Sequence, residues 1–467
     1  MADSQQHIAI IGSGSGAFAA AIRAVEAGAR VTMVEAGTIG GTCVNVGCVP
    51  SKILLRAAEI QHRRGHHPFN GIAADTAPVD GDALFAQIRD RVAELRESKY
   101  EAMLEAYDSI TYMPGRAHFE DANTIAVTRE DGSVQRLQPD RTLVATGASP
   151  ALPAIPGLAE TPYWTSTEAL FTAARPDHLI VLGSSFVALE IAQAYQRLGS
   201  EVTLIARSTV LSRDDPDVGE ALQAALKKEG VRVRTHTQPG RIDHDGERFH
   251  VSCADETTSA DRLLVATGRT PNTRALNPAA AGIETDADGA IVVGTDLRTS
   301  LGHIYAVGDC TALPKLVYIA AAAGTRAAVN MTGGHAELDL SVVPTVVFTD
   351  PQVATVGLDE QQAREQGLAP RARRLDLANV PRALANFDSE GFIKLIAEAG
   401  SGRLIGARIV AHNAGEVIQT AALAIRHRMS VNDLADELFP YLTLSEGLKL
   451  CAQTFTKDVR KLSCCAG

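Results

Sequence analysis

The first apolar segments of the chain follow the order strand, helix, strand. The run His7–Ile11 predicts a buried strand, Phe18–Glu26 has the composition of a helix, and Arg30–Val34 predicts a second strand. A glycine-rich stretch joins the first strand to the helix. This order is typical of a βαβ unit in a parallel sheet.

The turn of this unit has the pattern of a dinucleotide-binding site. Gly12 and Gly14 permit a tight turn and the approach of a pyrophosphate to the helix N-terminus, and Ala17 occupies the third position of the pattern. Glu35 closes the second strand, where such units place the carboxylate that binds a ribose hydroxyl. A glycine-rich turn without function would not need this register, so we predict nucleotide binding here.

The pattern recurs in the middle of the chain. His178–Leu182 predicts a strand, Gly183 begins the turn, a helix runs to Leu198, and Glu201–Ile205 predicts the next strand. The middle glycine of the turn is replaced by Ser185, so this second signal is weaker.

The residues after the second unit indicate which nucleotide it binds. Ala206 stands where the ribose-binding acid is expected, and Arg207 and Arg213 follow. A missing acid together with two arginines suits a 2′-phosphate, which predicts NADPH rather than NADH. The alternative is a pair of solvated surface arginines.

The remaining hydrophobic pattern predicts how the domains are arranged. Two near-identical strand ends, Leu143–Gly147 and Leu264–Gly268, each close one nucleotide-binding unit. Helical spacing predicts one long helix over residues 81–110, and β-branched runs with a hairpin of Phe392–Ala397 and Leu404–Val410 follow near the C-terminus. The predicted fold class is α/β, with two Rossmann-like nucleotide-binding domains and a C-terminal α+β domain.

Composition and charge exclude several classes of protein. The 467 residues carry a formal net charge of −11, which argues against nucleic-acid binding. No apolar run approaches the length of a membrane span, and the N-terminus does not have the pattern of a secretory signal, so we expect a cytoplasmic protein that binds no membrane. The seven cysteines, an odd number in a long chain, fit neither a secreted disulfide scaffold nor a paired zinc framework.

Two cysteines follow directly on the first nucleotide unit. Cys43 and Cys48 stand at the start of a predicted helix, close enough to form a small disulfide ring. The positive end of a helix lowers the pKa of a thiol, which favours redox or nucleophilic chemistry. The alternative is half of a zinc site, but no second ligand pair has a suitable spacing.

The segment Gly40–Lys52, GGTCVNVGCVPSK, resembles the active-site signature of the FAD-dependent pyridine nucleotide:disulfide oxidoreductases, and the resemblance covers nearly the whole chain. It implies FAD on the first unit, NADPH on the second, and a C-terminal dimerisation domain in a homodimer. The implied domains are residues 1–145 for FAD, 146–270 for NADPH, 271–340 as the central segment of the FAD domain, and 341–467 for dimerisation.

The same resemblance implies roles for individual residues. Cys43 is implied to be the interchange thiol and Cys48 the thiolate in charge-transfer contact with the flavin. Lys52 is implied to lie beside the flavin ring and to pair with Glu190, and Asp309 to contact the ribitol chain. The other residues implied to line the FAD are Gly37, Thr42, Ala117 and Val317.

One departure from the family concerns acid–base chemistry. Family members that reduce disulfides carry a His-Pro pair that acts with a glutamate to protonate the leaving thiol. In this chain Tyr441 and Leu442 replace that pair, although Glu446 remains. A tyrosine with an ordinary pKa of about 10 is a poor proton shuttle at neutral pH, so the catalyst of disulfide reduction is missing.

A second departure is the C-terminal pair Cys464 and Cys465. Adjacent cysteines form only a strained disulfide, but as thiolates on a short tail they can chelate a soft cation. Together with Tyr441, the pair makes the chain resemble those members of the family that reduce Hg(II), which implies NADPH-dependent reduction of Hg(II) presented as thiol complexes. By family analogy, the tail of one subunit delivers the metal to Cys43 and Cys48 of its partner. Alternatively, the pair is incidental at a disordered end.

Two other functions remain open from the sequence. A disulfide reductase of the large thioredoxin reductase type also carries a C-terminal redox pair, although the missing histidine argues against it. A thiol-based metal-binding protein with a vestigial nucleotide fold is the alternative from another class. Three histidines near two arginines, His62, His66 and His67, are interpreted as a solvated helix end rather than as metal ligands.

Overall fold

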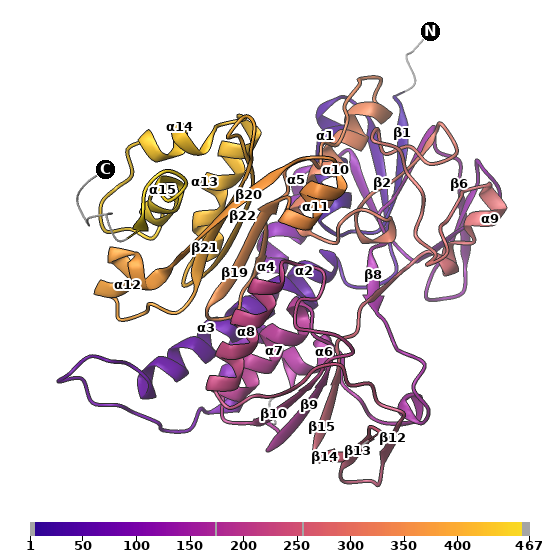
Figure 1. Ribbon diagram of the computed structural model, residues 1–467. Coiled ribbons are helices and arrows are strands. Elements are labelled where there is room, and N and C mark those ends of the chain that lie inside the picture. Colours follow the sequence, from indigo (N-terminus) through magenta and orange to yellow (C-terminus); the bar gives the residue numbers. More distant parts are fainter. Residues whose placement is uncertain (1–4, 173–174, 255, 460–467) are drawn as a thin grey trace.

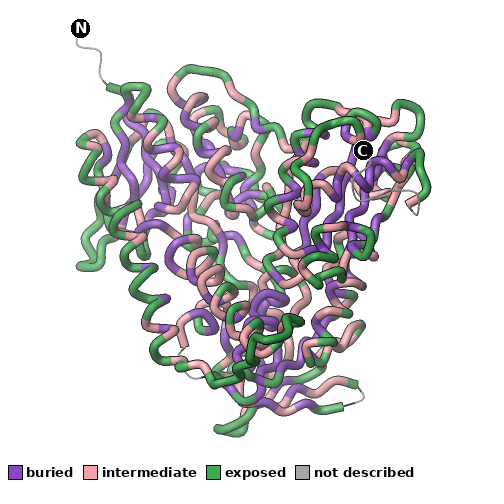
Figure 2. The backbone as a smooth tube through the Cα atoms, turned by 90° about the vertical axis from the view of Figure 1, so that its left-hand side faces the viewer, coloured by how far each residue is buried: buried purple, intermediate pink, exposed green. Residues whose placement is uncertain are grey.

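The computed structural model describes residues 5–172, 175–254 and 256–459 (Figure 1). Two parallel sheets with packed helices occupy the earlier parts of the chain, and an antiparallel sheet covered by helices forms the C-terminal part. Figure 2 shows that the strands are mostly buried, whereas exposed residues concentrate in loops and outer helices. The α/β class with two Rossmann-like units and a C-terminal α+β domain is therefore confirmed.

The first parallel sheet combines strands that lie far apart in the sequence. Its order is β17-β7-β1-β2-β3, and its pairings are all parallel. The strands are β1 (His7–Ile11), β2 (Arg30–Glu35), β3 (Ile110–Pro114), β7 (Arg141–Val144) and β17 (Ile304–Ala306). Helices α1 (Ser15–Glu26) and α10 (Val317–Met331) pack against each other beside it. Because β17 follows the second nucleotide unit in the sequence, the chain returns to complete the first sheet.

The second parallel sheet has the order β11-β10-β9-β15. Its strands are β9 (His178–Leu182), β10 (Glu201–Ile205), β11 (Arg232–Arg234) and β15 (Arg262–Val265). The helices of this part are α6 (Ser166–Phe171), α7 (Phe186–Arg197) and α8 (Pro216–Lys228). The bounds of β1, β9 and β10 agree with those predicted from the hydrophobic pattern, because short apolar runs next to glycine turns identify buried parallel strands well.

The duplication of the nucleotide units extends to side chains inside the sheets. The backbone N–H of His7 donates to Asp140 Oδ2 at 2.7 Å, and His7 Nε2 lies 2.8 Å from Thr32 Oγ1. The second unit repeats both contacts at 2.9 Å. Its equivalent residues are His178, Asp261 and Thr203. Sequence reasoning missed this repeat, although a histidine opens both strands.

Smaller antiparallel elements extend and connect the two parallel sheets. One three-stranded sheet contains β4 (Arg116–Phe119), β5 (Ile125–Thr128) and β6 (Val134–Leu137). Another contains β12 (Arg241–His244), β13 (Phe249–Ser252) and β14 (Thr257–Ala260). The pair β8 (Ala148–Pro150) and β16 (Arg269–Pro271) lies where the chain enters and leaves the second unit, and α9 (Pro278–Ala281) follows.

The C-terminal part is an antiparallel sheet of order β18-β19-β22-β21-β20. Its strands are β18 (Thr345–Val347), β19 (Gln352–Gly357), β20 (Pro370–Asp376), β21 (Phe392–Glu398) and β22 (Leu404–Ala411). The helices of this part are α11 (Glu360–Glu365), α12 (Pro381–Ala385), α13 (Ala414–Arg426), α14 (Val431–Asp436) and α15 (Glu446–Gln453). Among the described helices, none is both long and apolar enough to traverse a lipid bilayer.

The single helix predicted over residues 81–110 is wrong at its C-terminal end. The helix α4 (Gly81–Arg96) passes through a π-helical turn at Glu97–Glu101 into the short α5 (Ala102–Ala106), and β3 begins at Ile110. The strand is favoured there because it pairs with β2 and buries Ile110. The apolar periodicity of a helix does not reveal such a tertiary pairing.

Candidate active site

The two nucleotide turns have the same backbone geometry. Gly12 has φ +113° and Gly183 has φ +123°, both in the region that disfavours other residues. A Cβ atom on either glycine would lie 2.3 Å from a backbone oxygen, that of Ala145 in the first turn and of Ala266 in the second. Each turn therefore requires glycine at its first position.

The middle position of each turn obeys a different constraint. Gly14 and Ser185 both have negative φ, at −77° and −94°, and a Cβ added to Gly14 would meet no atom within 4 Å. The backbone thus accepts serine, which explains the departure in the second turn. Neither residue caps its helix with a side chain, so N–H groups at both helix ends remain for an anion such as a pyrophosphate.

Glu35 is held beside the first turn. Its carboxylate accepts hydrogen bonds from Ser13 Oγ and from the backbone N–H of Gly37, both at 2.6 Å. This places the acid predicted to bind ribose at the end of β2, next to the turn. The structure therefore brings together three of the predicted FAD residues, Gly12, Glu35 and Gly37.

Cys43 and Cys48 lie on consecutive helices. Cys43 is half-buried in α2 (Gly41–Val46), and the more exposed Cys48 is the first residue of α3 (Cys48–Gly65). Both are free thiols. The hydrogen bond between the two thiols raises the pKa of Cys43, whereas the same bond and the charge of Lys52 lower the pKa of Cys48 to about 7. Cys48 is therefore the better thiolate at neutral pH.

Lys52 lies one helical turn after Cys48, and the structure pairs it with Glu190 as expected. Lys52 Nζ is 2.7 Å from Glu190 Oε2, and the ammonium lies 4.3 Å from the ring centroid of Phe348. Glu190 is buried in α7 and also accepts a hydrogen bond from the Phe348 N–H at 3.0 Å. Phe348, which sequence reasoning missed, thus restrains both members of the pair.

Replacing Lys52 by methionine is expected to raise the pKa of Cys48 from about 7 toward the ordinary thiol value of about 8.5, because the thiolate loses a nearby positive charge. The pH dependence of alkylation by iodoacetamide, resolved for each cysteine by mass spectrometry, measures this shift. Lys52→Arg keeps the charge and should leave the profile near that of the wild type. An unchanged profile in Lys52→Met would mean that Lys52 does not stabilise the thiolate.

A second polar pair lies near the cysteines. Asp309 follows β17, and its Oδ2 lies 3.6 Å from Arg269 Nε. Burial raises the pKa of Asp309 and lowers that of Arg269. Arg269 Nε is buried without a hydrogen-bond partner in the described part of the chain, so this pair has unused capacity for a polar ligand. Sequence reasoning missed Arg269, which directly follows the repeated strand end.

The other residues expected to line the FAD differ in exposure. Ala17 and Ala117 are buried in α1 and β4. Thr42, in α2, and Val317, the first residue of α10, are accessible to solvent. Open space at Gly14, uncapped helix ends, a restrained Glu35 and the unsatisfied Arg269 together fit a large cofactor with a pyrophosphate and several hydroxyl groups.

The loop after β10 carries the two arginines expected to bind NADPH. Ala206 is buried, whereas Arg207 and Arg213 are both exposed. Neither arginine forms an ion pair with another residue in the described ranges. Phe186 opens α7 beside the second turn and is 42 % exposed. The loop therefore presents two available positive charges near the helix end.

The loop that replaces the His-Pro pair has a backbone that proline cannot adopt. Leu442 has φ +61°, whereas the proline ring fixes φ near −65°. The Leu442 N–H, which proline would lack, donates to Glu446 Oε2 at 3.3 Å. Tyr441 is 56 % exposed. The glutamate is thus held by the backbone, and Cys464 and Cys465 lie outside the described residues.

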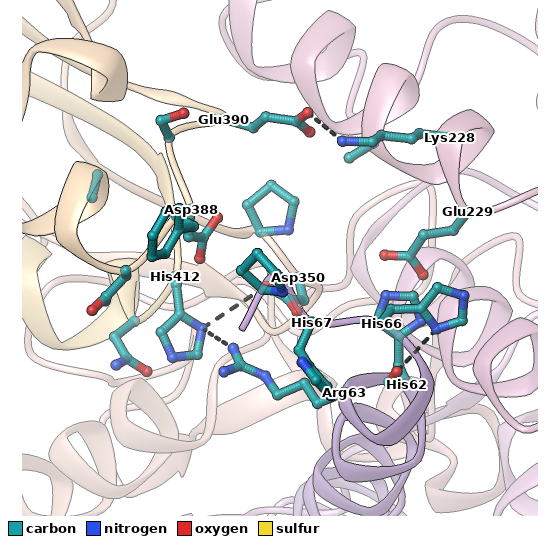
Figure 3. A pocket seen from close by; sticks show the side chains of 18 of the residues that line it. His62, Arg63, His66, His67, Lys228, Glu229, Asp350, Asp388, Glu390 and His412 are labelled. Carbon is teal, nitrogen blue, oxygen red and sulfur yellow. Dashed lines mark hydrogen bonds and ion pairs between the residues drawn. The ribbon is translucent and has the colours of Figure 1, made fainter. Parts of the chain in front are cut away.

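A cavity of about 1540 Å³ is lined by the end of α3 and by residues from α8 and the C-terminal part (Figure 3). His62, His66 and His67 line it at the C-terminal end of α3, where His66 is exposed and His62 and His67 are partly buried. His62 stacks on His66 with 4.3 Å between ring centroids, and both ring nitrogens of His67 are buried. Within the residues that the structure describes, no group of three or more His, Cys, Asp or Glu side chains is arranged for a metal.

Comparison with protein families gives two matches. A model described as pyridine nucleotide-disulphide oxidoreductase matches residues 6–324. A model of the dimerisation domain of the same family matches residues 343–452. Together these two models account for the parallel sheets and for the C-terminal antiparallel sheet.

Individual proteins are similar over nearly the whole chain. The mercuric reductase of Shigella flexneri is 59% identical over 467 residues, which cover 99% of this chain and 83% of that protein. The mercuric reductase of Acidithiobacillus ferrooxidans is 57% identical over 99% of this chain and 84% of its own length. Among solved structures, the HOCl-induced flavoprotein disulfide reductase RclA of Escherichia coli superposes with a TM-score of 0.86 at 28% identity, covering 97% of this chain and 100% of that one.

Proposed function

The chain belongs to the pyridine nucleotide-disulphide oxidoreductases, and on this basis we propose that it reduces Hg(II) to elemental mercury with electrons from NADPH. The observation that carries the proposal is 59% identity to a mercuric reductase over 99% of the chain. Two local features agree with it. Cys48 favours its thiolate form and so supplies a soft ligand for the metal, and the loop at Leu442 lacks the His-Pro pair that a disulfide reductase uses for acid–base chemistry.

The cofactors of this activity are FAD and NADPH. The first turn with Glu35 and the Arg269–Asp309 pair would hold FAD, and the second turn with Arg207 and Arg213 would hold NADPH. FAD, when bound, supplies a two-electron carrier between NADPH and the metal. Lys52, restrained by Glu190 and by the Phe348 ring, keeps a positive charge beside the thiolate.

The two cysteines of the site can take Hg(II) from a thiol complex by ligand exchange. The Cys48 thiolate attacks the metal first, because it is the deprotonated member of the pair. Cys43 then binds and gives up its proton, and one departing thiolate takes a proton for each thiol that binds. The protons released and taken up in the exchange are therefore equal, and no histidine is needed to transfer them. Overall, one Hg(SR)₂, one NADPH and one proton yield elemental mercury, NADP⁺ and two thiols.

We assign delivery of the metal to the C-terminal pair, Cys464 and Cys465. The matched dimerisation domain supports a homodimer. In that dimer, the tail of one subunit would present Hg(II) to Cys43 and Cys48 of the other, with Tyr441 lining the transfer path. A tethered thiol pair raises the local concentration of incoming ligand, which favours exchange against bound external thiols.

Replacing Arg207 and Arg213 by alanine is expected to raise the KM for NADPH roughly 10- to 100-fold, because two exposed charges that contact the 2′-phosphate are lost. The KM for NADH, which lacks that phosphate, should change less than about twofold. Steady-state kinetics with both nucleotides test this. Equal increases for both would mean that the arginines do not bind the phosphate.

Disulfide reduction remains the second candidate, because RclA is a disulfide reductase with the same fold. NADPH oxidation by the FAD-loaded protein separates the two functions. Hg(II) in excess thiol should stimulate oxidation, whereas oxidised glutathione or oxidised thioredoxin should not. Stimulation by the disulfides alone would favour the second candidate, and no turnover with either substrate would favour a thiol-based metal-binding protein.

A further inference from the structure

The loop that carries Arg207 and Arg213 is attached to the nucleotide turn on one side. The Leu211 N–H donates to the carbonyl of Ser184, and Ser184 Oγ donates to the carbonyl of Thr209, both at 3.1 Å. The segment between the two arginines therefore moves with the second turn. These two hydrogen bonds hold Thr209 and Leu211 against the nucleotide turn. They do not hold the C-terminal end of the loop at Asp214, which depends on other contacts.

The far end of the loop is an acidic segment that meets a basic row on the dimerisation domain. Asp214, Asp215 and Asp217 follow directly after Arg213. Opposite them, Lys394 on β21 is the register partner of Arg374 on β20 and of Arg408 on β22, so three cations lie side by side across three strands. Like charges in register destabilise a sheet unless opposite charges face them.

Lys394 is the centre of this contact. Its Nζ lies 2.8 Å from Asp215 Oδ2, 3.0 Å from Asp217 Oδ2 and 2.9 Å from Glu360 Oε2. The residue is only 7% exposed. Three carboxylates so close together repel one another once the ammonium is removed, and buried charges without a partner are costly. Lys394 therefore holds the acidic segment against the sheet.

Arg408 secures the residue next to Arg213. Arg408 forms an ion pair with Asp214, in which Nε lies 3.2 Å from Oδ1, and Arg408 Nη1 donates a hydrogen bond to the carbonyl of Val356 at 3.0 Å. Arg408 is 3% exposed, so its position is fixed by the core of the C-terminal sheet. Asp215 in turn caps α8 by accepting the Asp217 N–H at 3.1 Å. The start of α8 and the end of the loop are thus set by the dimerisation domain.

We propose that Lys394 and Arg408 are positioning residues for NADPH: through Asp214, Asp215 and Asp217 they hold the loop in the conformation in which Arg207 and Arg213 bind the 2′-phosphate. The inference rests on the proposed role of these two arginines. It makes the dimerisation domain a determinant of nucleotide choice.

The test uses the FAD-loaded enzyme and two probes, 2′,5′-ADP, which carries the 2′-phosphate, and 5′-AMP, which lacks it. Lys394→Met is expected to weaken binding of 2′,5′-ADP roughly 5- to 10-fold while the Kd of 5′-AMP changes less than about twofold. Lys394→Arg should restore the wild-type Kd, because it keeps the cation. Isothermal titration calorimetry measures each value directly, independently of turnover.

Two further variants make the result specific. Lys228→Met removes another lysine that pairs across the same two domains, with Glu390, and should leave both Kd values unchanged. Asp217→Asn keeps Lys394 in place with one carboxylate fewer, and should weaken 2′,5′-ADP binding in the same direction but less. It serves as the test if Lys394→Met does not fold.

The outcomes separate this inference from the proposed function. If Arg207→Ala with Arg213→Ala weakens 2′,5′-ADP binding but neither Lys394→Met nor Asp217→Asn does, the positioning role is wrong and the role of the arginines stands. If the arginine variant binds 2′,5′-ADP normally, the proposed phosphate site is wrong, and the inference with it. Equal weakening of both probes in Lys394→Met would show a general structural role and overturn the inference.

Discussion

Cys48→Ala is expected to lower the kcat of Hg(II) reduction by at least about 10³-fold, because the site loses both its thiolate and one of its two metal ligands. Cys43→Ala should be similarly inactive, since a single thiolate cannot hold the metal against external thiols. The two variants nevertheless differ in spectrum. Cys43→Ala keeps a thiolate at position 48 and should retain a long-wavelength thiolate-to-flavin absorbance, whereas Cys48→Ala should lack it.

The pH dependence of that absorbance follows from the pKa of Cys48. A thiol whose pKa is about 7 is mostly thiolate above that value, so the band of the two-electron-reduced wild type should fade as the pH falls through about 7. Cys253→Ala, a change at a half-buried thiol in another part of the fold, serves as the control and should keep both turnover and the band. A band that persists in Cys48→Ala would reverse the roles assigned to the two cysteines.

Replacing both Cys464 and Cys465 by alanine is expected to reduce kcat/KM roughly 10- to 100-fold for Hg(II) bound to a strongly binding thiol. Exchange from such a complex needs a second incoming thiolate, which the tethered pair supplies at high local concentration. Weakly ligated mercuric halides reach Cys43 and Cys48 without this help, so activity with them should largely survive. Steady-state kinetics with the two forms of the substrate measure the difference.

The two single variants, Cys464→Ala and Cys465→Ala, show whether delivery needs both thiols. Each should lie closer to the double variant than to the wild type, because one thiolate displaces only one ligand. The flavin spectrum and reduction by NADPH should be unchanged in all three. Full activity of the double variant on thiol-bound Hg(II) would contradict the delivery role of the tail.

Local features of the nucleotide units could be predicted from the sequence because they depend on few residues. Short apolar runs identified β1 and β9, and the glycines after them identified the turns at Gly12 and Gly183. The structure gives the reason, because both glycines have a positive φ that no other residue adopts easily. The pairing of Lys52 with Glu190 followed from family resemblance and is present in the structure. These features are encoded locally or by a long motif.

Contacts between distant segments could not be predicted in this way. The partners of Lys394, Arg269 and Phe348 come from separate parts of the chain, and composition alone does not identify them. The π-helical turn at Glu97–Glu101 and the burial of the two ring nitrogens of His67 depend equally on tertiary packing. In each case, the energy that selects the structure comes from a neighbour far away in the sequence.

The amount of elemental mercury released per NADPH consumed tests the central claim most directly. The FAD-loaded enzyme is supplied with NADPH and Hg(II) in excess thiol, mercury vapour is trapped and measured, and NADPH is followed by absorbance. Because each Hg(II) needs two electrons and each NADPH supplies two, the account predicts one mercury atom released for each NADPH oxidised. NADPH oxidation without mercury vapour, or efficient reduction of oxidised glutathione in its place, would contradict it.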